Sequence, residues 1–192
     1  ITCSKDKDHK KRVIAALGKL EGAYSLVLQV DGLMIGARDP YGFRPLCLGK
    51  LGEAYVLASE TCALDLVQAK YIRDIDPGEI VFITKNKIES VKPFAPKPPA
   101  MCIFELIYFA RPDSNIFGTN VYETRKRLGV NLAKEVKLDC DLVMPVPDSG
   151  VYAAVGFARE SGIPFEMGML RNHYVGRTFI QPSQNTRDFR VR

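Results

Sequence analysis

A proline-rich run near the middle of the chain constrains the fold more than any other sequence feature. Residues 92–100 read KPFAPKPPA and contain four prolines. Proline fixes φ and has no backbone N–H, so such a run is excluded from a helix interior and from a central strand. We therefore expect an extended linker at 92–100, with one domain at 1–91 and a second at 101–192.

The segment before this linker has the pattern of an antiparallel β-rich layer with helices beside it. Apolar residues at helical spacing predict a first helix, which Gly22 ends. Asp31-Gly32 is a turn signal between two apolar runs, of which the first is expected to be a buried strand. The expected elements are a helix at 8–20, strands at 23–30, 33–37, 46–49 and 54–58, a helix at 61–69 capped by Ser59-Glu60, a strand at 80–84 and a last strand after residue 87.

The segment after the linker alternates helices with short apolar runs. A helix over 121–136 precedes an apolar run at 142–146, which has the composition of a buried parallel strand. A turn at 148–150, a helix over 152–160 and an approach to another strand at 162–165 follow. This order is the beginning of a doubly wound α/β domain.

The junction between the apolar run and the next helix is a candidate phosphate site. It reads PVPDSG over residues 145–150. Ligands of parallel α/β sheets bind at the carboxyl ends of strands, and a helix N-terminus presents free N–H groups to phosphate. Ser149 can offer its hydroxyl to a metal-bound phosphate or a ribose. The alternative is that Asp148 or Ser149 is only the N-cap of the helix.

A second candidate is the polar run RNHYVGRTF at residues 171–179. Arg171 and Arg177 carry guanidinium groups suited to bidentate phosphate binding, and Tyr174 can close over a ligand. The alternative is a solvated polar loop in which His173 has no special role. The spacing of these residues does not decide between the two.

Two further runs are interpreted as structural first. Residues 37–46, ARDPYGFRPL, contain a strong turn, and Arg38 and Arg44 are placed to hold its carbonyl groups or Asp39. Residues 108–114, YFARPDS, contain a proline that disfavours helix at the residue before it. A strand or loop is expected there, with the aromatic side chains packed in a core.

Composition narrows the function classes. Hydrophobic residues make up 46% and charged residues 26%, as in a soluble globular protein, and no apolar run reaches the roughly 18 residues of a membrane helix. The net charge of +5 is spread along the chain without an aromatic stripe, so no nucleic-acid partner is expected. The five cysteines form no CxxC pair, which favours a reducing cytoplasm. Without an initial Met or an apolar leader, we expect a processed chain or a fragment.

Six runs, taken together, resemble the amidophosphoribosyltransferase family. They are ARDPYGFRPL, ASETCALD, RDIDPGE, FARPDS, PVPDSG and NHYVGRTFIQPSQ. They occur in the order typical of the family, so the resemblance covers essentially the whole chain. It implies a mixed α+β and α/β chain: the C-terminal half of an Ntn-hydrolase (αββα) glutaminase domain, then the start of a type I phosphoribosyltransferase domain.

The resemblance also implies a reaction. Family members release ammonia from glutamine and add it to phosphoribosyl pyrophosphate, with magnesium, giving 5-phosphoribosylamine, glutamate and pyrophosphate as the first step of purine biosynthesis. They are typically cytoplasmic homo-oligomers under AMP and GMP feedback, with no membrane or nucleic-acid partner. Cys3 lacks the surroundings of the nucleophilic cysteine, which is expected upstream. Because the diphosphate-binding acidic pair is also absent, these 192 residues alone are expected to be inactive.

Some site residues follow from the resemblance by position. Ser149 matches the serine of the magnesium-phosphoribosyl site. Arg171, Tyr174 and Arg177 match the start of the flexible loop that closes on phosphoribosyl pyrophosphate, although the family often has Lys at the first of these positions. Cys102 matches the first of four cysteines that hold a [4Fe–4S] cluster in some members. The alternative for Cys102 is a buried thiol.

Two other function classes stay open. The chain can be a non-enzymatic domain pair that binds nucleotide or assembles with a partner. It can also be a phosphoribosyltransferase without glutaminase activity. The β-rich region 23–90 argues against the second class, because it resembles a glutaminase.

Overall fold

The structure is a computed structural model that describes residues 1–192 except 2–3, 5, 86, 175–181, 186 and 188–192. The chain divides into two compact units, Ile1–Arg125 and Lys126–Arg192. Residues 92–100 form neither helix nor strand. The assignment of the segments before and after this linker to two functional domains stays a prediction. Among the described residues no helix has the length and apolar character needed to span a membrane.

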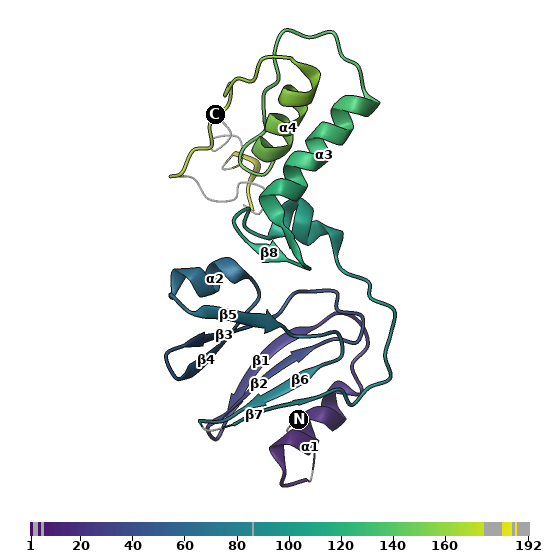
Figure 1. Cartoon of the computed structure of the whole chain (residues 1–192), viewed down its shortest axis with the longest axis vertical. Coiled ribbons are helices and arrows are strands. Elements are labelled where there is room, and N and C mark those ends of the chain that lie inside the picture. The colour runs from purple at the N-terminus through teal and green to yellow at the C-terminus, as the bar shows by residue number, and fades with distance from the viewer. Residues whose placement is uncertain (2–3, 5, 86, 175–181, 186, 188–192) are drawn as a thin grey trace. The chain divides into compact units, whose positions relative to one another are not determined.

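The first unit contains two antiparallel sheets (Figure 1), as the αββα resemblance implies, whereas the strand pattern alone predicted one β-rich layer. One sheet has the order β1-β2-β6-β7 and the other the order β4-β3-β5, and β8 pairs with β9 in a small hairpin. The elements are α1 (His9–Leu17), β1 (Ser25–Val30), β2 (Leu33–Arg38), β3 (Cys47–Leu51), β4 (Ala54–Ala58), α2 (Thr61–Leu66), β5 (Lys70–Asp74), β6 (Ile80–Ile83), β7 (Ile88–Val91), the π-helix η1 (Glu105–Phe109), β8 (Asn115–Ile116) and β9 (Thr119–Asn120).

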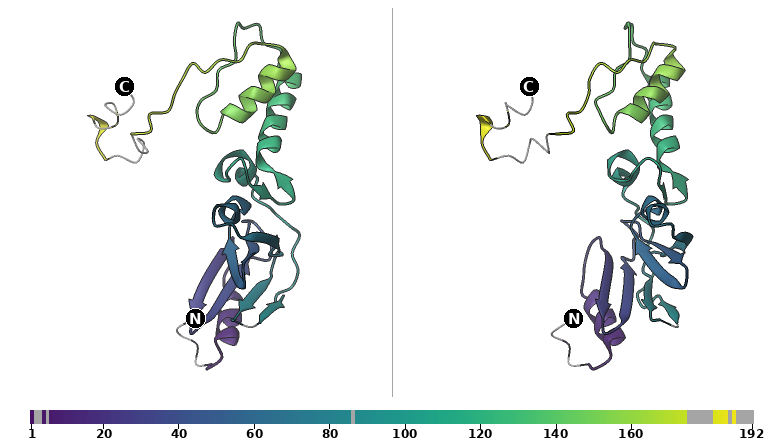
Figure 2. Two further views of the ribbon diagram at one scale, coloured as in Figure 1. Left: turned by 60° about the vertical axis from the view of Figure 1, so that its left-hand side comes forward. Right: turned by 90° about the vertical axis from the view of Figure 1, so that its left-hand side faces the viewer.

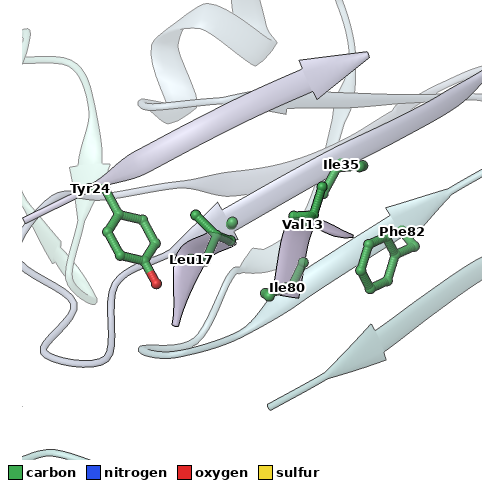
Figure 3. Packing of buried hydrophobic residues seen from close by; sticks show 7 residues of the cluster. Val13, Leu17, Tyr24, Ile35, Ile80 and Phe82 are labelled. Carbon is green, nitrogen blue, oxygen red and sulfur yellow. The ribbon is translucent and has the colours of Figure 1, made fainter. Parts of the chain in front are cut away.

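The two sheets and two helices stack in four layers, and the turned views of Figure 2 separate the sheets. Alternate residues of β6 point to opposite faces, as a strand requires. Ile80 and Phe82 join Val13 of α1 in one core, seen in Figure 3. Val81 and Ile83 of the same strand face the other sheet. They belong to a second core, whose other buried members are Leu46, Leu48 and Ile75. On the outer face of the second sheet, Leu64 of α2 packs against Cys47.

The first helix is shorter than expected. It begins after Asp8, whose carboxylate accepts the N–H of Lys10 at 2.9 Å, and it ends at Leu17. Gly18, not Gly22, is the C-cap, and its N–H donates to the carbonyl oxygens of the last turn.

The first hairpin is confirmed, but its first strand is not buried. Asp31 and Gly32 both have positive φ, 46° and 76°, as the two-residue turn of a right-twisted hairpin requires. Successive side chains of a strand point to opposite faces, so Leu26, Leu28 and Val30 of β1 pack against the core while Val27 is 51% exposed. Strand β5 was not expected: its residues KYIRD are mostly exposed and lack an apolar pattern.

Both helices of the second segment lie close to their predicted positions. Helix α3 (Val121–Glu135) begins in the first unit and continues into the second, and α4 (Val151–Ser161) lies in the second. Gly162 ends α4 with φ of 74°, the left-handed conformation common at helix ends.

Two glycines allow α3 and α4 to touch at their backbones. A Cβ atom on Gly129 would overlap the carbonyl oxygen of Ala153, and one on Gly156 would overlap that of Lys126. These contacts leave no room for any larger residue at either position.

The buried parallel strand expected at 142–146 is wrong for the described residues. Only an isolated parallel bridge joins Val143 to Phe165, with α4 between them. Leu142 is 47% and Val146 68% exposed, because a single bridge gives these apolar residues no sheet to lie within. The parallel direction around α4 still agrees with the start of an α/β domain.

Candidate functional site

Arg38 at the end of β2 stabilises the turn that follows it through hydrogen bonds. Its buried guanidinium donates from Nε to the carbonyl of Arg44 at 2.8 Å, from Nη1 to that of Ile75 at 2.7 Å, and from Nη2 to that of Gly42 at 2.8 Å. Burial lowers the pKa of Arg38, and nearby aspartates oppose that shift. The structural interpretation of this arginine is therefore confirmed.

Asp39 completes the same turn. Its fully buried carboxylate accepts backbone N–H groups from Tyr24 at 3.3 Å, Tyr41 at 3.0 Å and Phe43 at 3.2 Å. Three backbone donors satisfy a charge that would otherwise be costly to bury. The turn is therefore held by hydrogen bonds from both Arg38 and Asp39.

The carboxylate of Glu79 makes hydrogen bonds to other residues of the run RDIDPGE. Its buried carboxylate binds both Nη atoms of Arg73, at 2.8 and 2.6 Å, and accepts the N–H of Asp76 at 2.7 Å and the hydroxyl of Ser90. Burial alone would raise the pKa of Glu79, but these hydrogen bonds outweigh it and the pKa is lowered. The carboxylate is therefore charged at neutral pH.

Glu60 joins two of the six runs across the fold. Its Oε2 accepts the backbone N–H of Arg111 at 2.8 Å and the hydroxyl of Ser114 at 2.8 Å. Next to it, Thr61 Oγ1 accepts the N–H of Asn115 at 2.9 Å. The expected role of Glu60 as a cap is corrected: it precedes α2 but makes no side-chain cap hydrogen bond. ASETCALD is instead bound to the loop FARPDS.

Arg44 links its turn to the segment after the linker. Its Nε lies 2.9 Å from Oε1 of Glu105, its Nη1 lies 3.8 Å from Sγ of Cys102, and its guanidinium lies 4.6 Å from the ring centre of Phe109. Burial raises the pKa of Glu105, and the charge of Arg44 opposes the rise. Cys102 is partly exposed, so the buried-thiol alternative does not hold in this conformation.

The aromatic residues before the loop are not packed as expected. Tyr108 is 56% and Phe109 52% exposed. They lie on the π-helix η1, whose buried members include Glu105, so the aromatic side of this turn faces outward. The expected strand or loop is helical up to Phe109, but Arg111, the residue directly before Pro112, lies outside the helix, as the proline requires.

In the second unit, the structure brings Arg171 to the loop that carries Ser149. The Nη1 of Arg171 lies 2.9 Å from a carboxylate oxygen of Asp148, and both side chains are more than half exposed. Ser149 is half-buried in the turn before α4. Gly150 is the N-cap of this helix and no side chain caps it, so the N-cap alternative for Asp148 or Ser149 is wrong.

The remaining predicted site residues are not gathered there. The side chain of Tyr174 is fully exposed, and its backbone N–H donates to Asn172 Oδ1 at 2.9 Å. Arg177 and Cys3 lie outside the described residues. Within the part of the chain that is described, no group of three His, Cys, Asp or Glu side chains is placed to hold a metal ion. The roles of Ser149 and Cys102 toward metals therefore stay predictions.

Sequence reasoning missed the contacts of Glu60, Glu105 and Asp148. A glutamate before a short helix looks like a cap, and nothing local indicates that its partners lie more than 50 residues further along the chain. Asp148 was weighed only as a cap, although the positive charge of Arg171 in the same half of the chain was a usable signal.

Comparison with known proteins gives a consistent picture. No family model matches the chain. It is 49% identical over its whole length to the amidophosphoribosyltransferase of Rhizobium etli and 50% identical to the chloroplastic one of Glycine max. The archaeal enzyme of Archaeoglobus fulgidus is 47% identical over 94% of the chain. The chain spans 40%, 34% and 40% of these relatives' lengths.

Solved structures agree with the sequence matches. The glutamine phosphoribosylpyrophosphate amidotransferase from B. subtilis, complexed with ADP and GMP, superposes with a TM-score of 0.89 at 46% identity. The match covers all of this chain and 42% of that one. A structure described as the allosteric regulatory enzyme of purine biosynthesis matches equally well, over 41% of its chain. At this identity, sequence and fold are shared together.

Proposed function

We infer that residues 1–192 are a segment of an amidophosphoribosyltransferase, and that the protein containing them makes 5-phosphoribosylamine. The observation that carries this inference is a match along the whole chain, at 46–50% identity, to proteins and structures of that name. Glutamine and water give glutamate and ammonia. Ammonia then displaces pyrophosphate from phosphoribosyl pyrophosphate, as the first step of purine biosynthesis.

The layers of the first unit support a glutaminase role for residues 1–91. Two facing sheets, each covered by a helix, are the αββα arrangement expected of an Ntn hydrolase. The described cysteines of this segment are not suited to be its nucleophile. Burial raises the pKa of Cys47 to about 12 and also raises that of Cys62. Both are therefore neutral thiols at neutral pH and weak nucleophiles.

Residues 101–192 are proposed to begin the phosphoribosyltransferase domain. Arg171 is held by Asp148 in an exposed ion pair, and such pairs contribute only about 0–1 kcal/mol. A pyrophosphate group can therefore compete for this guanidinium at little cost. Arg177 is proposed to assist it, and the exposed Tyr174 to close over the bound substrate.

Magnesium is proposed to arrive with the substrate. Mg²⁺ is usually held by one or two protein oxygens together with substrate phosphates and water. Ser149, half-buried beside the Asp148–Arg171 pair, can supply one such oxygen. A [4Fe–4S] cluster needs four thiolates, and Cys102 is proposed as one of them. No step here depends on that cofactor.

Regulation and assembly are proposed by relationship. The B. subtilis structure is complexed with ADP and GMP, which supports feedback by purine nucleotides such as AMP and GMP. A homo-oligomeric state and a cytoplasmic location are proposed as for other members, although the plant relatives are named chloroplastic.

The phosphoribosyl half of the proposal is tested by an ammonium-dependent assay. Pyrophosphate release from phosphoribosyl pyrophosphate is measured for the complete protein and for Arg171→Ala. The variant is expected to raise the KM for phosphoribosyl pyrophosphate about 10- to 100-fold, because a charged hydrogen bond is lost. Arg159→Ala, an exposed position on α4, is the control. Lack of pyrophosphate release by the unaltered protein contradicts the function; equal KM values for the two variants contradict the role of Arg171.

A further inference from the structure

Glu60 lies where the sheets of the first unit meet the segment that follows the proline-rich linker. Its Oε2 is the common acceptor for the N–H of Arg111 and the hydroxyl of Ser114, and Ser114 is fully buried. Hydrogen bonds to a carboxylate are shorter and stronger than those between neutral groups. The bond from Asn115 to Thr61 lies beside them.

The loop that Glu60 holds is also the start of α3. The carbonyl of Ser114 accepts the N–H of Val121 at 3.0 Å, and that of Pro112 accepts the N–H of Tyr122 at 2.9 Å. These bonds satisfy donors in the first turn of α3, which have no partner within the helix. Glu60 therefore holds the loop from which α3 begins.

Other contacts between the two segments lie closer to the linker, although Arg38 also lies over the ring of Phe117, 5.5 Å from its centre. The N–H groups of Ala100 and Cys102 donate to the carbonyls of Tyr41 and Phe43, and Arg44 pairs with Glu105. These contacts hold the first residues after the linker against the turn at 39–44. Glu60 fixes its far end, at the point where the chain turns into α3.

We propose that Glu60 is a positioning residue that holds the loop before α3 against the glutaminase-like sheets, so that ammonia released in one reaction is used in the other. The inference rests on the proposed function. Ammonia is small and is lost to water by diffusion and protonation. Its efficient use therefore depends on two reacting groups being held at a fixed separation. A loosened connection is expected to leak ammonia while each half-reaction continues.

The two hydrogen bonds from Arg111 and Ser114 to Glu60, which we call the clasp, are tested first by amide hydrogen exchange on the complete protein. In Glu60→Ala, exchange of the peptide that covers residues 111–115 is expected to rise about 10-fold or more, because the acceptor of the Arg111 amide is gone. Glu60→Gln keeps one acceptor oxygen and is expected to lie between Glu60→Ala and the unaltered protein. Glu53→Ala, whose side chain is fully exposed, is the matched control. Exchange in Glu60→Ala equal to that of the control overturns the proposal.

The functional consequence is measured as the ratio of phosphoribosylamine formed to glutamate formed. Glu60→Ala is expected to lower this ratio about twofold or more, while the ammonium-dependent and glutaminase rates each stay within about twofold of the unaltered protein. Glu60→Gln is expected to restore part of the ratio. If Glu60→Ala fails to fold, Ser114→Ala removes one donor of the same clasp and is expected to lower the ratio in the same direction.

The outcomes separate the two claims. An unchanged ratio in a folded variant with a disrupted clasp overturns the positioning role. Equal losses in both half-reactions, without a change in ratio, also overturn it, because they indicate a purely structural residue. If the unaltered protein shows neither half-reaction, the proposed function itself fails, and this inference fails with it.

Discussion

Single charged side chains hold the turns of the first unit because each makes hydrogen bonds to several partners at once. Arg38, Asp39 and Glu79 are all buried, and the bonds of Arg38 reach Ile75 in the loop between β5 and β6. Such groups are costly to leave unpaired, so removing one partner affects several others. At this scale the account makes two predictions.

Arg38→Lys is expected to destabilise the protein although it keeps the charge. An ammonium group on a flexible stem cannot replace a planar fork that reaches three carbonyl groups. The free energy of unfolding, measured by urea denaturation, is expected to fall by about 2–4 kcal/mol. Lys11→Ala, on the exposed side of α1, is the control and is expected to change it by less than about 0.5 kcal/mol. Equal unfolding midpoints for these two variants would show that the carbonyl contacts do not matter.

Glu79 is expected to make stability depend on pH in the acid range. Its pKa in the folded state is lowered from 4.5, so its contribution is complete above that value and is lost as pH falls through the folded pKa. Glu79→Gln is therefore expected to be less stable than the unaltered protein at pH 7, and the difference is expected to shrink on acidification. Thermal melts over this range measure it. Glu53→Gln, at an exposed side chain, serves as control, and a constant difference for Glu79→Gln would contradict the argument.

Residue roles were partly predictable from sequence. Arg38 was expected to hold carbonyl groups of the turn because the turn residues lie next to it in the chain. Glu60 and Glu105 were not identified, because their partners are Arg111, Ser114 and Arg44, far away in sequence. Local patterns cannot show which distant donor a carboxylate will meet.

At the scale of elements, α3 and α4 show how small residues determine packing. Gly156 faces the carbonyl oxygen of Lys126 and Gly129 faces that of Ala153. Backbone atoms cannot move aside as a flexible side chain can. The α3–α4 contact is therefore sensitive to one added methyl group.

Gly156→Ala is expected to lower the melting temperature even though alanine is the better helix former. The gain in helix propensity is about 1 kcal/mol, and overpacking against backbone costs about 1–3 kcal/mol, so the loss is expected to win. Differential scanning calorimetry measures the shift. Asn131→Ala, exposed on α3, is expected to leave the melting temperature unchanged or slightly higher. A higher melting temperature for Gly156→Ala would contradict the close contact.

Helices were predicted better than strands, for a physical reason. The 3.6-residue period of α3 and α4 is local, so the sequence carries it. The exposed strand β5 has no apolar pattern, and its existence depends on pairing with β3. The apolar run 142–146 was expected to be a buried strand, but apolar composition does not supply neighbouring strands.

At the scale of the molecule, the sequence motifs indicate the family, and the structure shows which contacts those motifs make. The runs ARDPYGFRPL, ASETCALD, RDIDPGE and FARPDS contact one another through Arg38, Glu60 and Arg44. Their order along the chain was visible in sequence, and the resemblance implied two stacked sheets, but the residues that join the sheets were not visible, because these contacts are made between residues far apart. Within the first unit, these runs therefore join the turn after β2, the start of α2 and the loop before α3 to one another.

The central claim is that this chain is part of an enzyme that uses the amide nitrogen of glutamine to make phosphoribosylamine. The most direct measurement gives the complete protein glutamine labelled with ¹⁵N at the amide, together with phosphoribosyl pyrophosphate and magnesium. The account predicts ¹⁵N-labelled phosphoribosylamine, with pyrophosphate and glutamate formed in about equal amounts. Glutamate formation without labelled phosphoribosylamine, or no consumption of phosphoribosyl pyrophosphate, would contradict it.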